Sequence, residues 1–195
     1  MIEVARLAES ELERELDALA ALRIAVFREY PYLYEGTREY EQRYLRSYAT
    51  PRSVLVVARD GAQLVGAATA TPLLQHGDAV APPLCAAGYD PARVYYFGES
   101  VLLHAYRGRG LGHAFFDQRE AAAREHGFEV TAFCAVERPD EHPKKPAGYV
   151  PHDAFWSRRG YTKRADIVTT FSWRDRGEPS ESEKKMVFWL KEHAP

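Results

Sequence analysis

A glycine-rich run, Arg107-Gly108-Arg109-Gly110-Leu111-Gly112, is the segment whose residue types most clearly predict chemistry. Glycine leaves the backbone free of Cβ atoms, so successive N–H groups can turn toward one point. The run lies between an apolar, strand-like segment and an amphipathic, helix-like one, and the N-terminus of a helix attracts anions. We therefore expect this turn to hold a phosphate-bearing ligand.

Two common phosphate-binding motifs do not fit the run. A Walker A loop needs four residues between its glycines and then Gly-Lys-Ser/Thr. A dinucleotide fingerprint needs Gly-x-Gly-x-x-Gly, and the glycines at 108, 110 and 112 miss its last spacing. The pattern Arg/Gln-x-x-Gly-x-Gly/Ala does match, through Arg107, Gly110 and Gly112. Here the chain resembles the GNAT superfamily of N-acetyltransferases, and the order of its expected elements extends the resemblance over nearly the whole chain.

The resemblance implies that acetyl-CoA is the ligand and that no metal is needed. In this family the strand before the loop and the strand after its helix splay apart, and the pantetheine arm lies between them like an added strand. Main-chain groups of the first strand would pair with the pantetheine amides, and N–H groups of the turn would hold the pyrophosphate. The expected cofactor-binding residues are Ser100, Val101, Leu102, Arg107, Gly108, Arg109, Gly110, Leu111, Gly112, His113 and Trp156.

A carboxylate, Glu99, lies in the otherwise apolar strand before the loop. An attacking amine must lose a proton, and a buried carboxylate is a suitable acceptor. We expect Glu99 to be this base, although buried carboxylates also form structural ion pairs with arginine. Both interpretations stay open at the level of sequence. A strand N–H near Val101 or Leu102 could donate to the developing oxyanion.

The residue that would protonate the departing thiolate is not obvious. Many relatives have a tyrosine where this chain has Trp156, and an indole N–H does not titrate. Tyr149 is our candidate acid, and Tyr161 lies nearby in the sequence. A thiol with a pKa of about 8.5 can also leave unaided, which we slightly favour.

The acceptor site is predicted where the first helix ends and an aromatic loop begins. In relatives this loop lines the acceptor site, so Phe27, Tyr30 and Tyr32 are the expected substrate-binding residues. We expect a small primary amine as acceptor. The alternatives are a protein N-terminus or lysine, and a non-catalytic acyl-CoA sensor or interaction module. The same aromatic residues would also suit a homodimer contact.

The elements that must position these residues follow from periodicity and turn signals. We expect an α/β (α+β) fold of the GNAT type: a mixed, mostly antiparallel sheet with a central splayed parallel pair and helices on both faces. A capping box is predicted at Ser10 and Glu13, a hairpin at Asp60-Gly61 and a loop over residues 72–91. The expected helices span 10–28, 37–48, 110–126 and 153–159, and the expected strands span 53–59, 63–71, 93–103, 128–136, 167–173 and 185–191.

Length and composition limit the function classes. The 195 residues fit a single domain spanning 1–195, and 26 basic against 28 acidic residues leave no basic field for nucleic acid. The seven histidines show no metal-binding spacing. Two cysteines, no signal peptide and no apolar run long enough to cross a bilayer favour a cytoplasmic protein without membrane partners.

Overall fold

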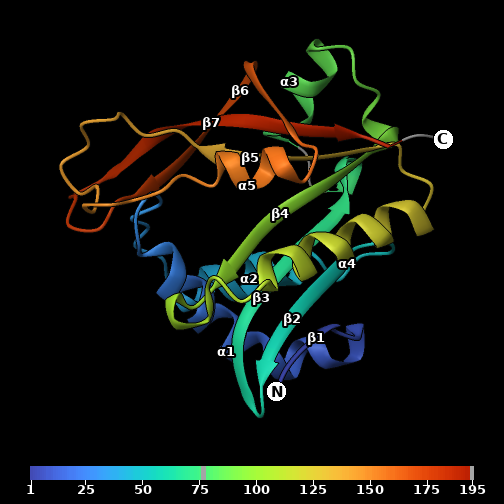
Figure 1. The fold of residues 1–195 in the computed structure, drawn as a ribbon, viewed down its shortest axis with the longest axis horizontal. Helices are drawn as coiled ribbons and strands as arrows, with labels where there is room; N and C mark the ends of the chain where they lie inside the picture. Colours follow the sequence, from blue (N-terminus) through green and yellow to red (C-terminus); the bar gives the residue numbers. More distant parts are fainter. Residues whose placement is uncertain (76–77, 194–195) are drawn as a thin grey trace.

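The computed structural model describes residues 1–75 and 78–193 and is built on a seven-stranded sheet of order β1-β2-β3-β4-β5-β7-β6 (Figure 1). The strands are β1 (Ile2–Arg6), β2 (Val54–Asp60), β3 (Gln63–Pro72), β4 (Val94–Leu102), β5 (Val130–Val136), β6 (Thr162–Arg174) and β7 (Glu181–Glu192). Neighbouring strands run antiparallel except β4 and β5, which are parallel. The predicted mixed sheet with one parallel pair is confirmed.

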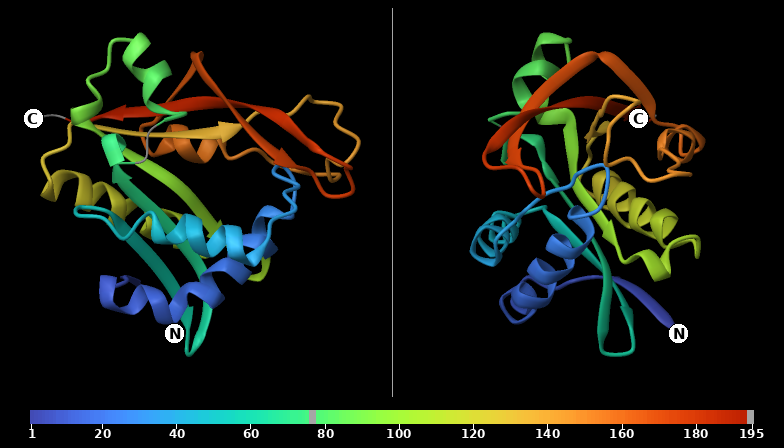
Figure 2. Two further views of the ribbon diagram at one scale, coloured as in Figure 1. Left: turned by 180° about the vertical axis from the view of Figure 1, so that it is seen from behind. Right: turned by 90° about the vertical axis from the view of Figure 1, so that its left-hand side faces the viewer.

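Helices cover both faces of this sheet (Figure 2). The α-helices are α1 (Glu9–Phe27), α2 (Arg38–Arg46), α3 (Ala81–Ala86), α4 (Leu111–Glu125) and α5 (Asp153–Arg158), and the 3-10 turns are η1 (Leu73–Gln75), η2 (Pro91–Arg93) and η3 (His104–Tyr106). Helices α1 and α2 pack on one face, whereas α4 and α5 lie on the other. Helix α4 connects β4 to β5, as expected for a crossover between parallel strands.

Several local signals act as the sequence predicts. The side chain of Thr37 caps α2 by accepting a hydrogen bond from the N–H of Tyr40 at 3.3 Å. Gly61 takes the left-handed conformation in the β2–β3 turn, with φ of 57°. Gly127 does the same immediately after α4, with φ of 74°, and thereby ends the helix.

The start of α1 and the first strand differ from the prediction. The predicted capping box at Ser10 is wrong, because α1 begins at Glu9 and the Glu11 side chain accepts from the N–H of Ala8 at 3.1 Å. Strand β1 was not expected, since a short edge strand that alternates polar and apolar residues at the chain terminus carries little signal. It pairs with β2 and adds an edge strand to the sheet.

The segment between β3 and β4 is also more ordered than the predicted loop over 72–91. Its described part contains η1, α3 and η2, whereas residues 76 and 77 lie outside the described part of the chain. Two of the prolines that indicated a loop, Pro82 and Pro83, lie in the first turn of α3, where a missing N–H costs nothing. Leu84 and Val80 anchor this helix over the sheet, at 0% and 2% exposure.

The core beneath α4 and α5 is strongly aromatic. Its rings belong to Tyr95, Phe97, Phe116, Phe128, Phe133, Phe155, Trp156, Tyr161 and Trp189. Such rings bury large apolar areas and make edge-to-face contacts, so they fix the helices firmly against the strands. Among the described residues, no helix is long and apolar enough to cross a membrane.

Candidate functional site

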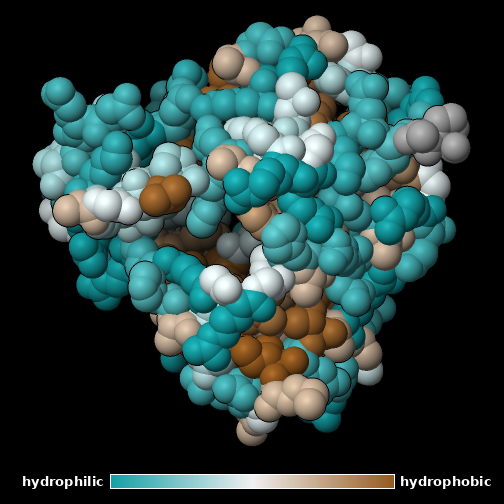
Figure 3. Space-filling view, viewed as in Figure 1, coloured by the Kyte–Doolittle hydropathy of each residue, from teal (hydrophilic) through white to brown (hydrophobic). Residues whose placement is uncertain are grey.

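The centre of the site is the gap that opens where β4 and β5 separate. The two strands pair at only three positions, Val94–Val130, Tyr95–Thr131 and Tyr96–Ala132. Beyond them β4 runs on to Leu102, whereas β5, which pairs with β7 from Val130 to Val136, makes no further pair with β4. The predicted splay is therefore present, and within the described part of the chain β4 from residue 97 onward has no strand partner on its β5 side. The space-filling view shows a hollow with apolar residues at its base in this part of the surface (Figure 3).

A β-bulge lies in β4 at the start of this unpaired stretch. Two β4 residues, Gly98 and Glu99, stand opposite the single β3 residue Thr69. A Cβ atom at position 98 would overlap the Tyr48 hydroxyl group and would lie 2.6 Å from Thr69 Oγ1. Position 98 therefore requires glycine because of close approach.

The side chain of Glu99 lies in a buried group of charges beneath α1 and α2. Its carboxylate forms an ion pair with Arg23 and accepts a hydrogen bond from the Tyr44 hydroxyl at 2.9 Å. Arg23 also donates to Glu41 at 2.5 Å, so one guanidinium lies between two carboxylates. All three charged side chains are at most 7% exposed.

This arrangement identifies the arginine partner that was an open alternative for Glu99. Arg23 also stacks against two rings, with its guanidinium carbon 5.0 Å from the Phe27 centroid and 4.2 Å from that of Tyr44. Burial acts against the charge of Arg23, but Glu99, Tyr44 and Glu41 outweigh it and raise the arginine pKa. The carboxylate of Glu99 is consequently held in one place.

The glycine-rich turn has the geometry of an anion-binding helix start. Gly108 and Gly110 adopt left-handed conformations, with φ of 75° and 82°, and Gly110 is the N-cap residue of α4. Since glycine has no side chain to cap a helix, the first N–H groups of α4 are left to a ligand or to water. Arg107 braces the turn by donating to the Leu102 carbonyl at 3.2 Å and to Glu29 at 2.7 Å.

Helix α5 lies beside this turn and contributes two aromatic residues with different surroundings. Trp156 packs into the aromatic core, with centroid distances of 5.1 Å to both Phe133 and Trp189. Phe155 faces α4 instead: a Cβ at Gly112 would lie 3.4 Å from its ring, and the His113 ring is 4.9 Å away. Phe155 is thus a neighbour of the turn that the sequence did not indicate.

The expected acceptor residues gather on the α1 side of the gap. The Phe27 ring lies 4.8 Å from that of Tyr32, and Tyr30 meets Tyr149 edge-on at 4.7 Å. Burial raises the pKa of Tyr32, and Cys134, Tyr149 and Glu99 raise it further. The structure therefore brings Tyr32 into electrostatic range of both predicted catalytic residues.

Tyr149 also lies within electrostatic range of Arg107, the first residue of the glycine-rich turn. Burial raises the pKa of its hydroxyl group, and the nearby charge of Arg107 opposes this shift. Burial likewise lowers the pKa of His152, and Arg107 adds to that effect. The charged side chain of Arg107 therefore acts on both Tyr149 and His152.

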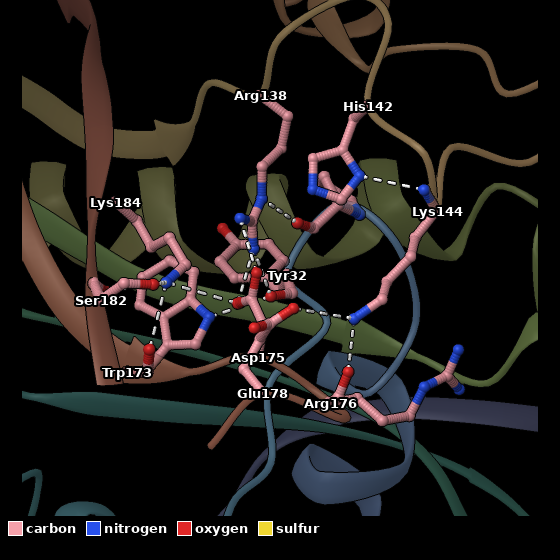
Figure 4. A network of polar contacts seen from close by, with 11 residues as sticks. Tyr32, Arg138, His142, Lys144, Trp173, Asp175, Arg176, Glu178, Ser182 and Lys184 are labelled. Carbon is pink, nitrogen blue, oxygen red and sulfur yellow. Dashed lines mark hydrogen bonds and ion pairs between the residues drawn. The ribbon is translucent and has the colours of Figure 1, made fainter. Parts of the chain in front are cut away.

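A polar network that the sequence did not indicate holds the aromatic loop in place (Figure 4). Arg138 donates to the carbonyl groups of Pro31 and Tyr32, each at 2.8 Å, and to both oxygens of Asp175, at 2.8 and 2.9 Å. The indole N–H of Trp173 also donates to the Tyr32 carbonyl, at 2.9 Å. These bonds fix the loop to the end of β5 and to the β6–β7 hairpin.

Sequence comparison places this fold and site in a family. The model of the acetyltransferase (GNAT) family matches residues 19–145, which include the second half of α1, the gap and the glycine-rich turn. The chain belongs to the GNAT acetyltransferase family. No curated protein is significantly similar to this acetyltransferase in sequence. Within its described residues, no group of three or more His, Cys, Asp or Glu side chains is placed to hold a metal ion.

Solved structures share the fold of this acetyltransferase over its full length. The ribosomal-protein-alanine N-acetyltransferase of Brucella melitensis is 16% identical, with 97% of this chain and 99% of that chain covered and a TM-score of 0.62. A GNAT-family protein of Desulfovibrio desulfuricans is 14% identical over 100% of both chains, with a TM-score of 0.63. The PaiA N-acetyltransferase of Thermoplasma acidophilum, solved with coenzyme A, is 10% identical over 99% of both chains, with a TM-score of 0.53.

Proposed function

We propose that this acetyltransferase moves the acetyl group of acetyl-CoA to a small primary amine by direct attack. The observation that carries the proposal is that two features follow each other along the chain. The unpaired edge of β4 from residue 97 leads through η3 to the start of α4, where glycine is the N-cap residue. An extended amide-bearing arm that ends in a pyrophosphate matches both features at once.

The cofactor site follows from these two features. Main-chain groups of Ser100, Val101 and Leu102 pair with the pantetheine arm, and N–H groups from Gly108 to His113 hold the phosphates. Arg107 and Arg109 add positive charge at the mouth of the turn, since both are exposed there. Acetyl-CoA supplies the activated thioester. Trp156 and Phe155 form the apolar wall on the α5 side.

The chemistry assigned to the chain is proton transfer and charge stabilisation. Glu99 accepts the proton that the amine loses, directly or through a water molecule, while Arg23 and Tyr44 hold its carboxylate. The amine nitrogen forms a bond to the acetyl carbon as the carbon–sulfur bond breaks. A β4 N–H near Val101 stabilises the developing oxyanion. The thiolate then takes up a proton, with Tyr149 as the candidate donor in the protein.

A small acceptor suits the packing of the aromatic loop. Phe27, Tyr30 and Tyr32 pack against neighbouring rings, and Arg138 fixes the loop carbonyls from below. A rigid aromatic wall favours a compact amine over an extended peptide.

Both cysteines are free thiols, in keeping with a reducing compartment such as the cytoplasm.

The proposal is tested by thiol release. The chain is incubated with acetyl-CoA and a panel of primary amines that includes polyamines, aromatic amines, aminoglycosides and lysine-containing peptides. We expect release with at least one small amine and its loss in E99Q by at least about a hundredfold in kcat. E183Q, a matched change at an exposed position of β7, is the control. Full activity of E99Q at saturating amine would remove Glu99 from the mechanism.

A second candidate function is acyl-CoA sensing without turnover. The observation in its favour is Trp156, which occupies the place of the tyrosine acid that the family resemblance implies and which lies within the aromatic core. Calorimetry distinguishes the two functions. Acetyl-CoA binding with no thiol release across the whole panel would favour the sensor.

A further inference from the structure

One buried cation, Arg119 of α4, is left unexplained by the proposed chemistry. It is 1% exposed, and its guanidinium lies 4.3 Å from the Phe97 centroid and 4.8 Å from that of Phe116. Among the described residues no carboxylate forms an ion pair with it. A buried charge without such a partner is costly, so its hydrogen bonds indicate what it does.

Those hydrogen bonds converge on the β4 bulge. Arg119 Nη1 donates to the carbonyl oxygens of Glu99 and Thr69, at 3.1 and 3.3 Å. Its Nη2 donates to Ser100 Oγ at 2.8 Å. Arg119 thus bonds the residues on both strands where their register shifts, and its planar fork holds them in a fixed relation.

The bulge decides where the β4 side chains point. Before it, Phe97 faces α4; after it, Ser100 again faces α4 through its bond to Arg119. Gly98 and Glu99, between them, both face the α1 side. Without the extra residue, strict alternation would turn Glu99 to the α4 face, away from Arg23.

Burial is consistent with a positioning role. It lowers the pKa of Arg119 to about 10, so the guanidinium stays charged at neutral pH in spite of its apolar surroundings. A charged fork makes stronger bonds to carbonyl oxygens than a neutral donor would. The bulge is therefore clamped from the face of the sheet that carries the cofactor turn.

We propose that Arg119 is a positioning residue for acetyl-CoA, because it clamps the β4 bulge that turns Glu99 toward α1 and presents the open edge of β4 to the pantetheine arm. This inference rests on the proposed cofactor site. It assigns Arg119 to the pantetheine half of that site alone, since its bonds reach β4 and not the glycine-rich turn.

Two ligands test the two halves of the cofactor site separately. Acetyl-CoA engages both, whereas adenosine 3′,5′-bisphosphate lacks the pantetheine arm and reports the nucleotide end. Calorimetry is performed with both ligands on the wild-type chain, on R119M and on R124M, an exposed arginine of the same helix. We expect R119M to weaken acetyl-CoA binding by at least about tenfold and the bisphosphate by less than about twofold, with R124M unchanged for acetyl-CoA.

Two milder variants keep the test decisive if R119M does not fold. R119K retains the charge but loses the planar fork, and S100A removes one acceptor at an exposed position. Each is expected to weaken acetyl-CoA by about threefold or more while leaving the bisphosphate unchanged. Equal loss of both ligands, or no loss in the folded variants, would overturn the inference. A wild-type chain that binds no acetyl-CoA would instead overturn the proposed function.

Discussion

Replacement of Arg23 by methionine tests the buried charge cluster around Glu99. Arg23 is 6% exposed, and Glu41 is fully buried at 0%. Methionine fills part of the arginine volume but leaves both carboxylates without their cation. The ring contacts of the guanidinium with Phe27 and Tyr44 disappear in the same step.

The expected cost follows from the number of groups left unpaired. Removing one partner of a buried ion pair costs about 3–5 kcal/mol, and here two carboxylates lose one shared partner, so R23M belongs near the upper end. In E99Q the bond between Arg23 and Glu41 survives, so the cost should be nearer the ~1.5–3 kcal/mol of a single hydrogen bond to a charged group. The cost of R23M/E41Q should fall between the costs of E99Q and R23M.

Urea unfolding at neutral pH, monitored by far-UV circular dichroism, measures these differences. The order of stability should be wild type, E99Q, R23M/E41Q, R23M. A cost below about 1 kcal/mol for R23M, or a cost for E99Q equal to that for R23M, would refute the view that Arg23 compensates two buried carboxylates. The E99Q result also shows how much of any activity loss comes from instability.

Three further predictions concern the bulge, the network under the aromatic loop and the candidate acid. G98A should cost about 1–3 kcal/mol in urea unfolding because its methyl group would overlap the Tyr48 hydroxyl, and Y48F should restore part of this; no restoration would contradict the overlap. Burial alone would raise the pKa of Asp175, but Arg138 lowers it below the unfolded value of about 3.9. The pair therefore adds stability that is complete above about pH 4 and is lost as the pH falls through the pKa of the folded state. R138M should therefore lower the thermal midpoint at pH 7 and flatten the decline of that midpoint below about pH 4. A decline in R138M as steep as that of the wild type would count against the pair. Y149F should keep kcat within about threefold if the thiolate leaves unaided, whereas a loss of about a hundredfold would make Tyr149 the acid.

The sequence predicted the parts of the fold that depend on local signals. Alternating and helical periodicity predicted the central strands and α4, and the glycine spacing predicted the turn at the start of α4. Glu99 and the loop tyrosines became candidates because a carboxylate in an apolar strand and aromatics in a loop are unusual.

Contacts between distant segments could not be predicted in the same way. In the sequence Arg119 resembles any other helix residue, because its contacts depend on a bulge that β3 and β4 form together. Arg138 and Asp175 are 37 residues apart, and neither is in a recognisable motif. Strand β1 and helix α3 were missed because tertiary packing, rather than local propensity, stabilises them.

The short pairing of β4 with β5 has a mechanical consequence. From Tyr96, the last paired residue, to Leu102 the strand extends six residues, a lever of about 20 Å. A rotation of about 5° at the paired end would displace the far end of such a lever by about 1.7 Å. That exceeds the tolerance of a hydrogen bond, so the width of the gap depends on cross-braces far from the pivot. The bonds from Arg138 to the aromatic loop, and those from Arg107 to Leu102 and Glu29, lie where such braces have the greatest leverage.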